Sequence, residues 1–295
     1  LAGVLAVWLF GFGTTTLAQV GPAGAIGGAL LEAAFAAVTI LWIIFPALVL
    51  YELQNRSGAL LTLRDAVGRI SAARRTQVVF IAWFFGLFME GVAGFGAPVA
   101  LTAPLLVGLG FTPTRAVTLA LIGHAAGVSF GALGTPVLAQ AALTAIPAAE
   151  IGRETALLNV VLGYVLLGSL VWLSGDKPPT GRDWAMGAFA GACFYAPYLA
   201  LATWVGPELP TAGGALIGGA SFALIVARRG GVPGAIDGRQ VVTAVLPYGL
   251  IVALVLVTRL VGPISDGLRS ITLTWSIWGE VRGEFLALYH PGVIL

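Results

Sequence analysis

The chain has 295 residues, of which 58% are hydrophobic and only 9% are charged, and its formal net charge is +2. A soluble domain of this length would carry roughly a quarter charged residues, so this composition excludes most water-soluble folds. The few basic residues lie in short loops, which is typical of a membrane topology signal and excludes a nucleic-acid-binding surface.

Apolar runs recur along the chain, near or above the roughly 20 residues that a helix needs to cross a bilayer. Continuous runs of this kind favour helices over the alternating pattern of a membrane barrel strand. We therefore predict an all-α, polytopic membrane protein. In chain order, ordinary spans are expected at 1–20, 29–51, 151–173, 183–205, 209–227 and 240–261, with a Gly/Pro/Ala connector at 21–28 and a mixed interfacial loop at 266–291.

The segment 53–75, between the second and third apolar stretches, carries five arginines against one acidic residue. Within it Leu60, Leu63, Val67 and Ile70 recur at helical spacing, which predicts an amphipathic helix on the membrane surface. The excess of arginine places this helix on the cytoplasmic side.

Two apolar stretches, 77–111 and 114–147, are interrupted by glycine and proline, at 91–98 and 131–136 respectively. Inside a helix, Gly costs about 1 kcal/mol relative to Ala and Pro about 3 kcal/mol. We therefore expect each stretch to be broken, with the proline in the first turn of a new half-helix, where its missing N–H is not needed. The alternative is a pair of kinks or close-packed small residues, because Gly is common in membrane helices.

The charges of the flanking loops predict how these stretches thread through the membrane. The arginine-rich segment before them is expected in the cytoplasm and the region near Glu150 outside, so the two stretches must together cross the membrane an odd number of times. The simplest solution makes 77–111 a re-entrant hairpin that returns to the cytoplasm, which leaves Arg115 cytoplasmic, and makes 114–147 one broken transmembrane helix. Both chain ends lie in apolar runs, so we expect a longer protein. The expected regions are 1–76 (scaffold spans and cytoplasmic helix), 77–149 (transport region), 150–265 (further scaffold spans) and 266–295 (interfacial loop leading into a second half).

Neighbouring helix breaks at mid-membrane depth indicate a transporter site, because the backbone groups they free are tolerated only against protein or a water-filled cavity. No Lys or Arg occurs at 77–114 or 116–152. A bound anion would therefore be held by half-helix N-termini, backbone N–H groups and hydroxyls. The expected binding residues are Gly94, Phe95, Gly96, Ala97, Ser129, Gly134 and Thr135.

Two titratable residues lie beside the breaks. An ionised carboxylate at the bilayer centre costs about 3 kcal/mol or more, so Glu90 is a candidate for proton coupling or cation coordination; the alternative is a helix-end contact or an interfacial position. Imidazole titrates near physiological pH, so His124 is a candidate proton relay; the alternative is a packing residue with a satisfied ring.

Sites of other kinds are not expected. Cys193 stands alone in an apolar run, which excludes an intrachain disulfide framework and a multi-thiolate zinc site and favours a small core residue. No Ser/His/Asp grouping or metal-spaced cluster occurs, so we expect neither an enzyme nor a cofactor or metal.

The residues around the breaks resemble the lactate permease family of bacterial and archaeal secondary transporters. The resemblance runs through 90–100 (EGVAGFGAPVA) and 104–111 (PLLVGLGF) and resumes at 130–136 (FGALGTP). It implies proton symport of L-lactate and related 2-hydroxy monocarboxylates, D-lactate and glycolate, across the plasma (inner) membrane. It also implies an elevator-type inverted-repeat architecture, of which this chain would hold one repeat and part of the scaffold.

The expected partners are a small organic anion, protons and membrane lipid, and the assembly is open between a monomer and a homodimer. One alternative is sodium-coupled carboxylate uptake, with backbone carbonyls at the breaks holding Na⁺. An alternative of another class is an intramembrane lipid-diphosphate phosphatase, which would need arginines or metal-binding carboxylates beside Glu90. A further alternative is that the segment has no activity alone.

Overall fold

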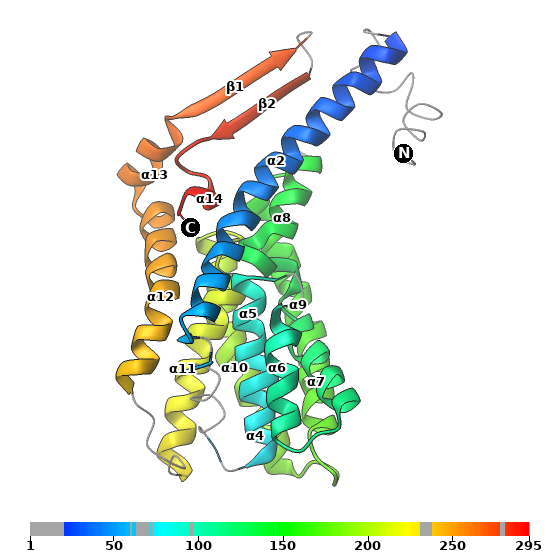
Figure 1. Cartoon of the computed structure of the whole chain (residues 1–295), viewed down its shortest axis with the longest axis vertical. Helices are drawn as coiled ribbons and strands as arrows, with labels where there is room; N and C mark the ends of the chain where they lie inside the picture. The colour runs from blue at the N-terminus through cyan, green and yellow to red at the C-terminus, as the bar shows by residue number, and fades with distance from the viewer. Residues whose placement is uncertain are drawn as a thin grey trace.

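The computed structural model describes residues 21–59, 61–62, 71, 73–94, 97–144, 146–230, 238–277 and 281–294 (Figure 1). The span expected at 1–20 lies outside these residues. So do Leu60, Leu63, Val67 and Ile70, on which the expected amphipathic surface helix depends.

The described elements are helical except for one two-stranded sheet. In chain order they are α2 (Gly21–Arg56), α4 (Arg74–Val78), η2 (Val79–Phe85), α5 (Gly86–Val92), α6 (Ala97–Gly108), α7 (Pro113–Ala125), η3 (Val128–Phe130), α8 (Gly131–Thr144), α9 (Ala148–Leu173), α10 (Gly181–Trp204), α11 (Pro210–Gly230), α12 (Gly238–Leu260), α13 (Gly262–Arg269), β1 (Thr272–Ile277), β2 (Val281–Leu286) and α14 (Pro291–Ile294).

Five of the described helices are long and apolar enough to cross a membrane, or six if the bent pair α7–α8 is one span. Their outer faces carry large apolar side chains: on α9, Leu158, Val161, Leu162 and Val165 are 62–69% exposed. Such a surface suits lipid and would be an aggregation liability in water. The prediction of a polytopic helical membrane protein is confirmed.

Two segments differ from the prediction. The expected connector 21–28 forms the first turns of α2, because Gly and Pro are tolerated in membrane helices and Pro22 lies in the first turn. The expected interfacial loop contains α13 and the antiparallel pair β1–β2, in which Thr272 lies opposite Leu286. The alternation of polar and apolar residues along β1 is the period of a strand. Trp275 on β1 packs edge-on against Phe35 of α2, with ring centroids 5.3 Å apart.

The segment from α4 to α6 is a helical hairpin whose two ends lie together. Figure 1 shows α4 and α5 rising and α6 descending beside them. At the base, the Arg74 Cζ atom lies 4.0 Å from the centre of the Phe111 ring. The chain therefore returns to the end from which the hairpin begins, as the loop charges predict.

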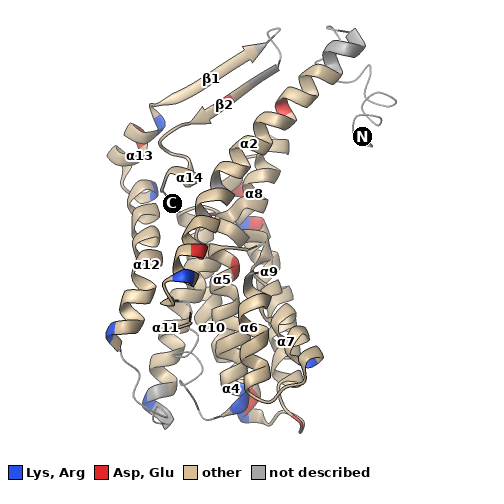
Figure 2. Cartoon of the chain, in the orientation of Figure 1, with Lys and Arg blue, Asp and Glu red and all other residues tan. Residues whose placement is uncertain are grey.

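Basic residues gather at this same end (Figure 2). Arg74 and Arg115 both bind Asp176 in the turn between α9 and α10, at 3.2 and 2.7 Å. The hydrogen bond from Arg115, with the positive charge of Arg74, lowers the pKa of Asp176. Because basic loops tend to stay in the cytoplasm, this clustering is what the predicted cytoplasmic position of this end requires.

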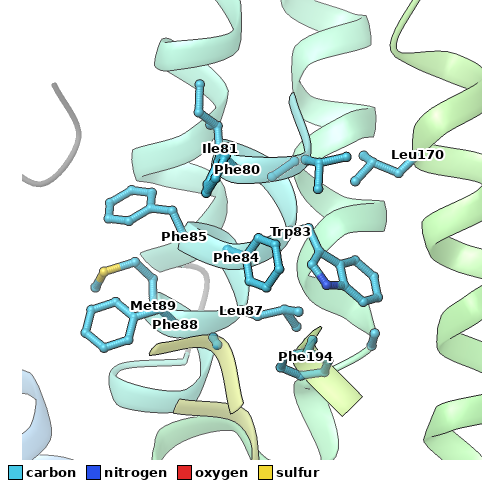
Figure 3. Packing of buried hydrophobic residues seen from close by; sticks show 14 of the residues in the cluster. Phe80, Ile81, Trp83, Phe84, Phe85, Leu87, Phe88, Met89, Leu170 and Phe194 are labelled. Atoms are coloured by element: carbon cyan, nitrogen blue, oxygen red, sulfur yellow. The ribbon is translucent and has the colours of Figure 1, made fainter. Parts of the chain in front are cut away.

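The rising arm of the hairpin is the centre of the core (Figure 3). Every residue from Val78 to Val92 is buried. Trp83 meets Phe194 of α10 and Phe80 meets Phe222 of α11, with ring centroids 5.6 and 5.0 Å apart. Part of this arm, η2, is a π-helix, a rare form that is frequent at functional sites.

Small residues allow the neighbouring helices to approach this arm closely. A Cβ atom added to Gly91 would lie 2.3 Å from the backbone N of Ala212 on α11. One added to Gly123 on α7 would lie 2.2 Å from the carbonyl oxygen of Ala82. Such contacts between backbones are the usual means of tight packing in membranes. The hairpin, α7 and α11 therefore form one closely packed bundle.

Candidate functional site

The tip of the hairpin is the first helix break. The N–H groups of Ala93 and Gly94 both donate to the carbonyl oxygen of Met89, at 2.9 and 3.2 Å. Gly94 has φ +58°, the left-handed conformation that commonly ends a helix and that Gly adopts without strain. The next helix, α6, begins at Ala97, with Pro98 in its first turn. Phe95 and Gly96 lie outside the described residues.

The second break, between α7 and α8, is a sharp elbow in which the two helices bend by 62°. Ala132, Leu133 and Gly134 have φ values of 43°, 56° and 78°, and regular helix resumes at Thr135. Left-handed backbone costs about 1–2 kcal/mol per residue for residues other than Gly, so the surroundings must hold this turn in place. The predicted broken helix is confirmed, with its proline, Pro136, at the start of the second half.

Contacts from the loop between α10 and α11, and from the first turn of α11, hold the elbow. A Cβ atom on Gly134 would lie 2.2 Å from the carbonyl oxygen of Pro207, so only glycine fits there. The Thr211 hydroxyl donates to the carbonyl oxygen of Gly127 at 2.9 Å. The loop between α10 and α11 is therefore part of the site, although the sequence indicates it only as a connector.

The two breaks meet around the carboxyl group of Glu90. A Cβ atom on Gly131 would lie 2.2 Å from Glu90 Oε1, and one on Gly94 would lie 3.6 Å from the same oxygen. The added Cβ of Gly94 would also lie 3.2 Å from Ala132 Cβ. Glu90 is 5% exposed and is thus enclosed between the hairpin tip and the elbow.

His124, in the last turn of α7, faces this carboxyl group. Its Nε2 lies 3.9 Å from Glu90 Oε2, beyond direct hydrogen-bond range. Its Nδ1 lies 2.7 Å from the carbonyl oxygen of Ala120, an acceptor, so Nδ1 carries a proton. Nε2 is then an acceptor in the neutral ring and a donor in the charged ring. A proton that enters this space can therefore bind either to the carboxylate of Glu90 or to Nε2 of His124.

The hydrogen-bond donors expected for an anion are only partly free. The Gly94 N–H donates to Met89, and the Thr135 hydroxyl donates to the carbonyl oxygen of Ala132 at 2.6 Å. Both therefore stabilise the breaks themselves. Of the other expected residues, Ser129 is half-buried in η3, and Ala97 begins α6.

Two features of the site are not evident from the sequence. Glu208, beside Pro207, forms an ion pair with Arg259 at the end of α12, with Arg259 Nη2 2.6 Å from Glu208 Oε1. An apolar crevice also lies where the hairpin, the elbow, α11 and α12 meet, and it is lined by Phe88, Val92, Leu133, Leu209, Ala212, Tyr248, Ile251 and Val252. The sequence gives one indication of the ion pair. Arg259 stands at the end of an apolar span, where an arginine without a partner is costly. Among the described residues, no group of three or more His, Cys, Asp and Glu could hold a metal ion.

Comparisons with known proteins agree on one family. A family model described as L-lactate permease matches residues 3–276. The glycolate permease GlcA of Escherichia coli (strain K12) is 39% identical over 191 residues, which are 63% of this chain and 33% of that protein. An L-lactate permease of Bacillus subtilis (strain 168) is 37% identical over 206 residues, 68% of this chain and 36% of that protein.

A further relative, an L-lactate permease of Streptococcus iniae, is 30% identical over 272 residues, 87% of this chain and 56% of that protein. The chain thus spans between about a third and about half of the length of these relatives. No solved structure matches it. The match to the family model covers most of the chain and includes both helix breaks. The chain therefore belongs to the L-lactate permease family and is a multi-pass protein of the plasma membrane.

Proposed function

We propose that the chain forms the proton-coupling part of a secondary carrier for 2-hydroxy monocarboxylates such as lactate and glycolate. The substrate class is supported by relatives that are named as lactate and glycolate permeases. The observation that carries the mechanism is the position of Glu90, whose carboxyl group lies beside Gly131 at one helix break and Gly94 at the other.

Charge balance supports proton symport over uptake of the free anion. A lone anion entering this apolar bundle would add its charge to that of an ionised Glu90, and two uncompensated negative charges in a low-dielectric site repel each other strongly. A proton taken up by Glu90, or by His124 beside it, removes that repulsion. The loaded carrier then moves its cargo with little net charge.

The carboxylate of the substrate is placed at the junction of the two breaks. The N-terminal ends of α6 and of the regular part of α8 would contribute the positive end of the helix dipole and those first-turn N–H groups that have no intrahelical partner. Ser129 adds a hydroxyl. Binding by dipoles is weaker than binding by a dedicated cation, which suits a carrier that must release its cargo on the other side.

The packing suggests which helices move together. The hairpin, α7 and α11 touch through their backbones, and a Cβ atom added to Gly163 of α9 would lie 3.3 Å from Ala126 Cβ at the end of α7. The apolar stretches of α2 and α12 are only 0 and 22% buried. In the elevator-type mechanism that we propose, α9–α11 therefore travel with the hairpin and the broken helix. The spans α2 and α12 then belong to the scaffold. Of the region 150–265, all of which is expected from the sequence to be scaffold, only the part with α12 then remains scaffold.

Uptake by the full-length protein in proteoliposomes tests the coupling. With a proton gradient imposed, Glu90→Gln is expected to abolish accumulation of L-lactate above equilibrium, because the amide cannot bind and release the coupled proton. Lactate-for-lactate exchange should persist. Glu150→Gln, an exposed carboxylate in the first turn of α9, is the matched control and should accumulate lactate normally.

Undiminished proton-driven accumulation by Glu90→Gln would refute the coupling role. Replacing sodium by choline in the buffer separates the two coupling ions: uptake that stops in choline and ignores the proton gradient would replace proton symport by sodium symport. Absence of lactate and glycolate uptake in the unsubstituted protein would refute the proposed substrate class.

A further inference from the structure

The ion pair between Glu208 and Arg259 lies at the end of the bundle opposite the cytoplasmic arginines. Glu208 is in the loop between α10 and α11, and Arg259 is in the last turn of α12. The two side chains are 6 and 4% exposed. A charged pair so deeply buried is costly unless its remaining polar atoms are also paired.

Only one of the two hydrogen bonds that this ion pair could make is formed. A guanidinium and a carboxylate commonly bind through two parallel hydrogen bonds, but here Arg259 Nη2 meets Glu208 Oε1 alone. Arg259 Nη1 and Glu208 Oε2 are both buried and have no hydrogen-bond partner among the described residues. Leaving a buried charged donor unpaired is unfavourable. Arg259 therefore holds a vacant donor suited to a second carboxylate oxygen.

The pair is coupled to the elbow of the broken helix through one residue. The added Cβ of Gly134 would lie 2.2 Å from the Pro207 carbonyl oxygen and 3.1 Å from the backbone N of Glu208. On its other side Arg259 is covered by the Tyr289 ring, with Cζ 3.6 Å from the ring centre. Arg269 lies over the same ring at 4.3 Å. The pair thus joins the elbow, α12 and the C-terminal segment.

We propose that Arg259 binds the carboxylate of the transported anion on its outer approach to the site, and that Glu208 occupies Arg259 as an internal carboxylate when the anion is absent. This inference rests on the proposed function. Exchange of one carboxylate for another keeps the buried guanidinium paired throughout, and the released Glu208 must then reach water or take up a proton, because a buried unpaired carboxylate is costly. It also frees Glu208, and with it the loop at the elbow, from α12, so that anion binding loosens the contact between the bundle and a scaffold span.

A purely structural ion pair is the rival explanation, and Glu208 separates the two. If the pair only stabilises the fold, removing either partner should weaken the protein and the binding of substrate. If Glu208 competes with the substrate, its removal should strengthen substrate binding. Glu208 then no longer occupies Arg259, so a larger fraction of the protein is ready to bind the substrate.

The test measures L-lactate binding to the purified full-length protein by calorimetry, together with thermal unfolding with and without lactate. Arg259→Lys retains the charge and the pairing with Glu208 but offers a point charge in place of a planar fork, and it should raise the Kd for lactate about tenfold. Glu208→Gln should lower the Kd at least about threefold. Its unfolding temperature should fall without lactate and recover when lactate is added. The matched control is Arg269→Gln, because Arg269 lies over the same Tyr289 ring but not in the ion pair. It should leave the Kd unchanged.

An unchanged Kd in Arg259→Lys, or weaker lactate binding in a folded Glu208→Gln, overturns the inference while lactate binding by the unsubstituted protein upholds the proposed function. If Glu208→Gln does not fold, Arg259→Lys decides the question alone. Absence of lactate binding in the unsubstituted protein overturns the substrate class and this inference together.

Discussion

At the scale of single residues, the site depends on the absence of side chains as much as on their presence. Glu90 can lie between the two breaks because Gly131 leaves room for its carboxyl group. The neighbouring Ala132 and Leu133 adopt left-handed backbone that only their surroundings can maintain. The position of the Glu90 carboxylate is thus set by backbone geometry, and His124 Nε2 lies 3.9 Å from it.

Gly131→Ala tests this dependence. Gly131 has φ −64°, which alanine also adopts, so the substitution adds a methyl group without backbone strain. That methyl would lie 2.2 Å from Glu90 Oε1 and must displace the carboxyl group. A misplacement of about 1 Å can cost on the order of 100-fold in rate, so initial uptake of lactate should fall at least about tenfold.

The matched control is Gly249→Ala in the middle of α12, where an added Cβ meets nothing within 4 Å. It should retain normal uptake. Normal uptake in Gly131→Ala as well would show that Glu90 is not held in place by this contact.

At the scale of elements, the sequence predicts what is local and misses what is distant. Both helix breaks are evident because Gly and Pro act on their own positions. The pairing of Glu208 with Arg259 joins residues 51 positions apart, and no local pattern links them. The left-handed turn at Ala132 is likewise hidden, because alanine carries no signal for positive φ. The strand pair after α13 follows an alternation that is visible but short.

The C-terminal segment, with β2 and α14, should loosen in mild acid. Burial, together with the positive charge of Arg259, lowers the pKa of His290 to about 4, and its Nδ1 accepts the N–H of Gly292 at 3.3 Å. In the unfolded chain imidazole titrates near pH ~6.5. The unfolded segment therefore binds more protons between these values, and the stability present above pH ~6.5 is lost as the pH falls towards ~4.

Hydrogen exchange of residues 281–294 at about pH 7 and about pH 5, corrected for the intrinsic pH dependence of exchange, measures this effect. Protection should decrease at the lower pH in the unsubstituted protein and change much less in His290→Gln. Equal pH dependence in both proteins would show that another group controls the segment.

At the scale of the whole molecule, the distribution of charge gives the orientation and the hairpin gives the topology. The bases of the hairpin, of α7 and of the α9–α10 turn meet at Asp176, and the breaks lie towards the opposite end. A membrane-spanning bundle with this arrangement should expose the start of α7 to the cytoplasm and the start of α9 to the outside.

Cysteine labelling in intact cells tests this orientation in a full-length protein that lacks reactive thiols. With Cys193 replaced by Ala, a cysteine at exposed Thr112 should resist a membrane-impermeant maleimide until the cells are opened. A cysteine at exposed Glu150 should react at once. Labelling of position 112 from outside would contradict the re-entrant threading of the hairpin.

The shared binding of Arg74 and Arg115 to Asp176 has a mechanical consequence. Arg74 at the base of the hairpin and Arg115 at the start of α7 are held by the same carboxylate, so these two bases cannot separate while both salt bridges are formed. In the carrier that we propose, the hairpin and α7 therefore change position together, and breaking either salt bridge would allow one to move without the other.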